Sequence, residues 1–254
     1  MTTAAPLFDA SLIRDDAERA EAMRLRYDVF VREMGASAPF ADHAAGRETD
    51  RYDDAAEMLV LRDLTRQEGS RIVGVYRLIH GCGPQTDRFY SAQEYDLGPL
   101  LAADRRVLEL GRSCLHPDYR GGTAMYHLWQ ALARYVIEQR FEVLFGVASF
   151  HGTDVQSLAQ PLSLLHHNHL APPHLRVRSR RFQAMDLVPP EQIDRRCAMQ
   201  AVPALIKAYL RLGGFVGEGA FVDHDFNTID VCLVVDTASL NARQRAIYLT
   251  PGRE

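Results

Sequence analysis

The stretch LELGRSCLHPDYRGGTAMYHLWQALARYV, from Leu108 to Val136, carries three structural signals in succession. A strand-like segment contains Glu109, a short turn places two glycines after Arg120, and a helix with periodic apolar residues follows. The next apolar run, EVLFGVAS, is typical of a strand that is covered on both faces. A strand, a helix and a strand in this order predict a parallel pair with a right-handed crossover.

The composition is that of an ordinary soluble globular protein. The chain has 254 residues, of which 47% are hydrophobic and 24% are charged, and this length is sufficient for a sizeable core. A net charge of −4 gives no basic field for nucleic acid. No apolar run approaches the ~20 residues of a membrane span, and the first residues lack the features of a signal peptide. We therefore expect a cytoplasmic protein whose four widely spaced cysteines are reduced thiols, with no metal site built from them.

The rest of the chain predicts a mixed α/β fold. Periodicity predicts a helix over Asp16–Met34 that ends at Gly35, and two strands, AEMLVLRDL and RIVGVYRLI, predict a hairpin. Residues 162–181 have an irregular pattern, whereas AVPALIKAYLRLGG and TIDVCLVVD predict a helix and a strand. We expect one domain over residues 1–254, with a core over about 20–150 and a C-terminal elaboration over about 151–254.

Glu109 is unusual because it lies within a predicted strand. Strand alternation places it on the opposite face from Arg112, but a glycine inside a strand often marks a bulge, and Gly111 lies between them. A bulge would bring Glu109 and Arg112 to one side and leave backbone N–H groups available to bind a carbonyl oxygen. A structural ion pair between Glu109 and Arg112 is one interpretation of this placement, and it is compatible with a catalytic role for Glu109.

The turn YRGGTA has the features of a phosphate-binding loop. Its glycines allow close approach of the backbone, the following helix start offers N–H groups, and Arg120 adds a positive charge. The alternative is a tight strand-to-helix turn with a solvated arginine.

These elements resemble the core of the GNAT acyltransferase superfamily, whose usual turn is R/Q-x-x-G-x-G/A. The resemblance implies a mixed, splayed sheet flanked by helices. RGGTA is one residue shorter than the usual turn, which suggests a smaller anion than pyrophosphate, such as the phosphodiester of a carrier protein's phosphopantetheine arm.

The N-terminal half also resembles the acyl-homoserine-lactone synthase branch. The matching positions are Arg26 and Phe30 in RYDVF, Asp50 and Asp53 in DRYD, Arg77 in VYRL, and the pair Glu109 and Arg112. ELGRSCLHPDYRGG, VLFGVASFHGTD and LSLLHHNHLAPPHLRVR together resemble the L-ornithine Nα-acyltransferase family, the lyso-ornithine-lipid synthases. This similarity extends from about Met23 to Val235.

The resemblance implies transfer of a 3-hydroxyacyl group from acyl carrier protein to the α-amine of L-ornithine, without a metal or redox cofactor. Three alternatives are another amino-acid acceptor such as glutamine, lysine or glycine, a homoserine-lactone-type signal synthase, and a non-catalytic module that binds acyl carrier or lipid. The expected catalytic residues are Glu109, Arg112, Ser113, Cys114 and His151. The expected donor-binding residues are Arg120, Gly121, Gly122, Thr123, Ser149 and Phe150, and the expected acceptor-binding residues are Arg26, Phe30, Asp50, Asp53 and Arg77.

Three further clusters have competing interpretations. Cys114 with His116 would suit a cysteine nucleophile, but a free cysteine is commonly a small buried residue. His166, His167, His169 and His174 lack a second ligand cluster, so we expect no metal there. Arg176, Arg178, Arg180 and Arg181 form a basic run that suits the acidic carrier protein, an anionic membrane leaflet on the inner face of the plasma membrane, or solvent alone.

Overall fold

The computed structural model describes residues 5–39 and 41–240, which group into two compact units. Within these residues, unit 1 comprises 5–39, 41–79 and 110–140, and unit 2 comprises 80–109 and 141–240. Two strands, β3 (Ile72–Gly81) and β5 (Val107–Leu115), contribute residues to both units. The sequence predicts one domain with a core over about 20–150 and a C-terminal elaboration over about 151–254, and this stays a prediction.

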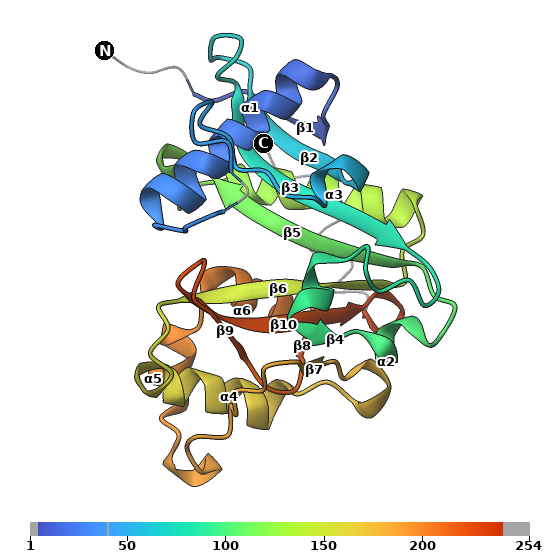
Figure 1. The fold of residues 1–254 in the computed structure, drawn as a ribbon, viewed down its shortest axis with the longest axis vertical. Coiled ribbons are helices and arrows are strands. Elements are labelled where there is room, and N and C mark those ends of the chain that lie inside the picture. Colours follow the sequence, from blue (N-terminus) through green and yellow to red (C-terminus); the bar gives the residue numbers. More distant parts are fainter. Residues whose placement is uncertain (1–4, 40, 241–254) are drawn as a thin grey trace. The chain divides into compact units, whose positions relative to one another are not determined.

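The sheet of unit 1 has the strand order β1-β2-β3-β5 (Figure 1). Strands β1 (Phe8–Leu12), β2 (Glu57–Asp63) and β3 pair antiparallel, and a register shift interrupts the β2–β3 ladder at Leu61. The predicted hairpin of β2 and β3 is therefore confirmed.

The first helix of unit 1 changes its winding halfway. Helix α1 (Asp16–Arg26) begins after Asp15, whose carboxylate accepts a hydrogen bond from the backbone N–H of Glu18 at 2.9 Å. The chain continues as a π-helix over Tyr27–Glu33 and ends at Gly35, which has a left-handed φ of 75°. The predicted helix over 16–34 is confirmed, and its second half is wider than an α-helix, a feature often found at functional sites.

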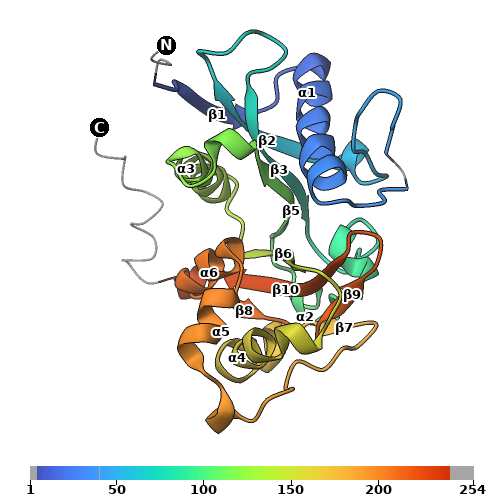
Figure 2. The same cartoon turned by 90° about the vertical axis from the view of Figure 1, so that its left-hand side faces the viewer.

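Helices cover both faces of the sheet in unit 1 (Figure 2). Ala22 and Leu25 of α1 pack with Met58 and Val60 of β2, while α3 (Ala124–Glu138) packs against β1 and β2. Gly74 permits close packing, because a Cβ atom there would lie 2.7 Å from Leu115 Cδ2 of β5 and 3.4 Å from Leu128 Cδ2 of α3. The helix predicted from Thr123 to about Gln139 is confirmed.

The sheet of unit 2 is mixed and continues the order β5-β6-β10-β8. Residues 107–109 of β5 pair in parallel with β6 (Val143–His151), which confirms the predicted parallel pair. Strand β10 (Thr228–Asp236) runs antiparallel along the whole of β6 and also pairs with β8 (Phe215–Val216) and β9 (Phe221–Asp223). Strands β4 (Tyr95–Asp96) and β7 (Arg178–Ser179) form a separate pair.

The helices of unit 2 correct one prediction. They are α2 (Gly98–Leu101), α4 (Ala159–His169), α5 (Arg195–Ala201) and α6 (Ala204–Arg211). The irregular structure predicted for residues 162–181 is wrong over α4, whose Leu162, Leu164 and Leu165 are buried. Pro161 does not prevent this helix, because it occupies the third helical position, where the N–H has no intrahelical partner.

Short 3-10 turns link these elements. They lie at Asp53–Ala55, Tyr90–Gln93, Pro117–Tyr119, Gln156–Leu158, Pro173–Leu175, Pro190–Gln192 and Thr237–Ser239. Among residues 5–39 and 41–240, no helix has the length and apolar character that crossing a membrane requires.

Candidate active site

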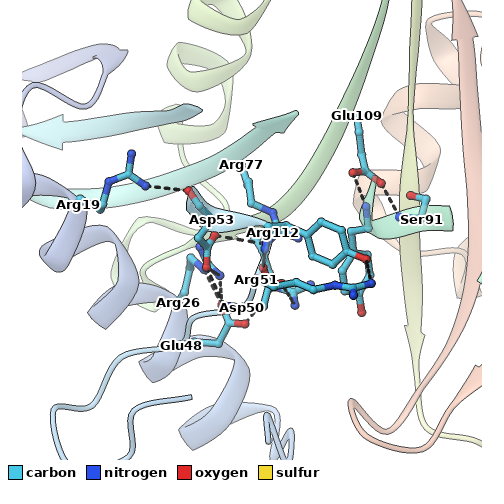
Figure 3. A network of polar contacts seen from close by, with 12 residues as sticks. Arg19, Arg26, Glu48, Asp50, Arg51, Asp53, Arg77, Ser91, Glu109 and Arg112 are labelled. Carbon is cyan, nitrogen blue, oxygen red and sulfur yellow. Dashed lines mark hydrogen bonds and ion pairs between the residues drawn. The ribbon is translucent and has the colours of Figure 1, made fainter. Parts of the chain in front are cut away.

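Four of the five predicted acceptor-binding residues meet in one polar network of unit 1 (Figure 3). The Nη1 and Nη2 atoms of Arg26 donate to the two carboxylate oxygens of Asp53 at 2.7 and 3.1 Å. The Nη1 atom of Arg77 donates to Asp50 Oδ1 at 2.6 Å and lies 3.3 Å from Asp53 Oδ1. The three-residue spacing of the two aspartates therefore gives both of them guanidinium partners.

Arg112 and Glu48 complete the network. Arg112 donates to Glu48 Oε1 at 3.1 Å and to Asp50 Oδ2 at 2.9 Å, and Arg26 Nε donates to Glu48 Oε2 at 2.5 Å. The network thus contains three guanidinium groups and three carboxylates, so its charges balance. Glu48 was not among the predicted site residues, and it balances the charge of three arginines that face two aspartates.

Burial and charge act against each other in this network. Arg26 is fully buried and Asp53 is 3% exposed. Burial alone would raise the pKa of Asp53, but the charges of Arg26 and Arg77 and the Arg26 hydrogen bond outweigh it and leave that pKa lowered. Burial alone would lower the pKa of Arg26, but Glu48 and Asp53 leave it raised. Both groups therefore stay ionised near neutral pH.

The network is at the same time a structural element and a candidate binding site. Its carboxylates already have cationic partners, so an ammonium group would have to share them. The acceptor-binding role of these residues stays a prediction. Phe30, the fifth predicted acceptor residue, packs against the apolar cluster of α1 and β2 from the π-helix.

The sequence predicts a bulge at Gly111, and the backbone of β5 is irregular one residue later, at Arg112. Arg112 has a left-handed φ of 48°, a conformation that non-glycine residues seldom adopt. Gly111 does not itself require the absence of a side chain, because a Cβ atom there would lie 3.8 Å from Arg77 Nε. The unusual backbone of Arg112 is held by its ion pairs with Glu48 and Asp50.

Glu109 is held by a turn of unit 2. Its carboxylate accepts hydrogen bonds from the backbone N–H groups of Tyr90 and Ser91, at 2.9 and 2.6 Å, and its residue is only 2% exposed (Figure 3). These donors are at the start of the 3-10 turn Tyr90–Gln93. The two backbone N–H donors therefore hold this carboxylate in a fixed orientation.

The strand registers place two predicted residues on the same face of the sheet as Glu109. Glu109 is opposite Phe145, and Ser149 and His151 follow Phe145 at two-residue steps along β6. Both are exposed, whereas Phe150 points to the opposite face and is 2% exposed. Ser149 and His151 therefore share the Glu109 face of unit 2, and Phe150 belongs to the core.

The turn before α3 has an open backbone. Gly121 has a φ of 78°, and a Cβ atom at Gly121 or Gly122 would have no neighbour within 4 Å. Thr123, the residue before α3, makes no side-chain hydrogen bond that caps the helix. Arg120 donates to both carboxylate oxygens of Glu33, at 2.5 and 2.7 Å, and this pairing raises its pKa. Glu33 therefore competes with any anion that approaches Arg120.

The cysteine-nucleophile alternative has a physical obstacle. Cys114 is buried, and burial raises the pKa of its thiol to about 12, which opposes formation of the reactive thiolate. Ser113, its neighbour on β5, is partly exposed. In the histidine-rich segment, His167 contacts the backbone oxygen of Val188, and burial lowers the pKa of His169.

Comparisons with known proteins agree with this fold. Residues 25–130 match the family model described as an acetyltransferase (GNAT) domain. A crystal structure of the CoA-dependent acyl-homoserine lactone synthase BjaI superimposes with a TM-score of 0.52 at 19% identity, covering 96% of this chain and 88% of that one. This likeness shows a GNAT-like mixed sheet flanked by helices, as predicted.

Curated relatives are much closer in sequence. The chain is 55% identical over 249 residues to an L-ornithine Nα-acyltransferase of Rhodobacter capsulatus, with 96% of both chains covered. It is 39% identical over 236 residues to an L-ornithine Nα-acyltransferase of Brucella abortus, covering 89% of this chain and 83% of that one. The chain belongs to the L-ornithine Nα-acyltransferase family.

Proposed function

We propose that this chain transfers an acyl group to the α-amine of L-ornithine, forming an amide. The observation that carries the proposal is 55% identity, over 96% of both chains, to a relative with that activity. The chemistry of the site also supports the proposal, because two backbone N–H groups orient the buried Glu109 carboxylate, which can act as a base.

The proposed reaction begins with removal of a proton. Amino groups of this type titrate near ~8, so most of the acceptor is protonated at neutral pH, and only the free amine attacks a thioester. Glu109 accepts this proton, directly or through a water molecule, while the N–H groups of Tyr90 and Ser91 orient its carboxylate. The amine nitrogen then forms a bond to the thioester carbonyl carbon, and the resulting oxyanion is stabilised by backbone N–H groups near Gly111–Cys114. The carbonyl re-forms as the C–S bond breaks, the nitrogen gives up its second proton to the leaving thiolate, and the proton on Glu109 passes to solvent.

The donor in this proposal is a 3-hydroxyacyl group on acyl carrier protein. The open Gly121–Gly122 turn and the start of α3 suit a single phosphate group, such as the one in the phosphopantetheine arm. Arg178, Arg180 and Arg181 are exposed and suit the acidic surface of a carrier protein. The product would be a lyso-ornithine lipid.

An acceptor and donor panel tests the proposal. The purified chain is incubated with 3-hydroxyacyl carrier protein or the corresponding CoA thioester, and with ornithine, lysine, glutamine or glycine. Thiol release and new amides are then followed by mass spectrometry. We expect the ornithine amide from the carrier-protein donor, whereas thiol release without any amide would contradict the acyltransferase assignment.

A further inference from the structure

A second group of acidic residues lies in unit 2, apart from the balanced network of unit 1. Glu94, Asp223 and Asp230 each offer a carboxylate oxygen, and these three oxygens lie within 4.8 Å of one another. Glu94 and Asp230 are each 3% exposed, and Asp223 is partly exposed. Carboxylates this close together repel each other, and a cation placed among them relieves that repulsion.

A buried hydroxyl group is directed to the same place. Thr228 is 2% exposed, and its Oγ1 atom has no hydrogen-bond partner among the described residues. Thr228 is directly opposite Asp223 in the β9–β10 ladder and two residues before Asp230 on β10, so all three side chains share one face. A buried hydroxyl normally has a partner, and a donor bound among the carboxylates would supply one.

This cluster is on the same face of the sheet as Glu109. Strand β10 places Thr228, Asp230, Cys232 and Val234 at two-residue steps, and Val234 is opposite Phe145, the partner of Glu109. The turn that holds Glu109 through Ser91 N–H also leads to Glu94, whose N–H donates to Ser91 O at 3.1 Å. Burial raises the pKa of Cys232, and the charges of Glu109 and Glu94 raise it further.

Two arginines of this part of the chain make hydrogen bonds to other groups. The Nη1 atom of Arg178 donates to Glu218 Oε1 at 2.6 Å, and the Nε atom of Arg180 donates to the backbone oxygens of Ala92 and Tyr95. A primary ammonium group has three N–H donors, which matches three carboxylate oxygens assisted by one hydroxyl. A divalent cation such as calcium or magnesium also binds carboxylate oxygens and completes its ligands with water, so it is the competing occupant that the test below includes.

We propose that Glu94, Asp223, Asp230 and Thr228 bind the side-chain ammonium of the amino-acid acceptor, while Glu109 serves its α-amine. This inference rests on the proposed function, because it assigns the part of the chain that recognises the ornithine side chain. One group of acidic residues then selects the cationic side chain, and a separate carboxylate activates the amine that reacts. The separation of the two roles explains why the α-amine is the one acylated.

The test compares ornithine with 2-aminopentanoic acid, which is the same molecule without its side-chain amine. The readout is the ratio of kcat/KM for the two acceptors. We expect Asp230→Asn to lower this ratio about 10- to 100-fold, as for a lost charge-assisted contact, with KM for the acyl donor unchanged. Thr228→Val should lower it about 2- to 10-fold. Asp186→Asn, the same charge change at an exposed loop residue, is the matched control and should leave the ratio unchanged.

Four outcomes separate the possibilities. An unchanged ratio in folded Asp230→Asn, with active wild-type protein, overturns this inference and leaves the proposed function intact. If Asp230→Asn does not fold, the partly exposed Asp223→Asn carries the same test. The wild-type protein could lose activity in EDTA and regain it with Mg²⁺ or Ca²⁺. If Asp230→Asn shows no such metal-dependent activity, the cluster binds a metal and the inference is overturned. A wild-type protein that acylates no amine overturns the proposed function and this inference together.

Discussion

Arg26 and Asp53 form a two-bond ion pair that is closed to solvent: the side chains are 0% and 4% exposed, and both guanidinium–carboxylate bonds are 3.1 Å or shorter. Removing one partner of such a pair leaves the other buried and uncompensated. Arg26→Met should therefore lower the free energy of unfolding by about 3–5 kcal/mol, measured by urea denaturation.

The matched control for this change is Arg32→Met. Arg32 belongs to the following π-helix and pairs with Asp28, but these side chains are 68% and 52% exposed. An exposed pair contributes about 0–1 kcal/mol. Equal stabilities of the two variants would show that the buried network is not a stabilising element.

The same pair predicts a pH dependence of stability. Burial tends to raise the pKa of Asp53, but Arg26 and Arg77 leave it lowered in the folded state. The unfolded chain therefore takes up the proton first, near the ordinary value of about 3.9. The stabilisation is fully present above that value and is lost as pH falls toward the lower folded pKa.

Urea midpoints of the wild-type protein and Asp53→Asn between pH 7 and pH 3 test this sign. The wild-type protein should have the higher urea midpoint, by a margin that is constant above about pH 5 and shrinks below about pH 4. An advantage that grows as the solution becomes more acidic would contradict the assignment.

Glu109→Gln should lower kcat by about 10²- to 10⁴-fold, because the amide no longer accepts the proton of the amine. Glutamine has nearly the same shape but only one acceptor oxygen, so one of the N–H groups of Tyr90 and Ser91 loses its acceptor, and the melting temperature should fall moderately while the protein stays folded. Glu138→Gln, at the exposed end of α3, is the control for loss of a negative charge. A well-folded Glu109→Gln protein with the wild-type rate would exclude Glu109 as the base.

Arg120 and Glu33 should have opposite effects on donor binding. Arg120→Ala removes a positive charge beside the open glycine turn and should raise KM for the acyl donor about tenfold, with kcat nearly unchanged. Glu33→Gln removes the competing carboxylate and should lower that KM. If both substitutions raise KM, or if neither changes it, the turn does not bind the donor's phosphate.

The regular elements could largely be predicted from the sequence because their signals are local. The hydrophobic period predicted α3 within about a residue, Gly35 ended the first helix as expected, and the apolar run of residues 143–149 lies in strand β6, which is mostly buried. Helix α4 could not be predicted in this way, because burial of three leucines outweighs a local pattern that contains Pro161 and several histidines.

The candidate sites required information that is not local. Family resemblance supplied Arg26, Asp53, Arg77 and Arg112, but the side chain that balances their charges, Glu48, is visible only once the chain has folded. The cluster of Glu94, Asp223 and Asp230 joins segments more than a hundred residues apart, so no spacing rule identifies it. The left-handed backbone at Arg112 instead of Gly111 is likewise set by tertiary ion pairs.

The most direct measurement is the position of the acyl group on ornithine after incubation with 3-hydroxyacyl carrier protein. Fragmentation mass spectrometry distinguishes an amide at the α-nitrogen from one at the side-chain nitrogen. The account predicts a single product acylated at the α-nitrogen, with one carrier thiol released per amide. Acylation at the side-chain nitrogen, or thiol release without any amide, would contradict it.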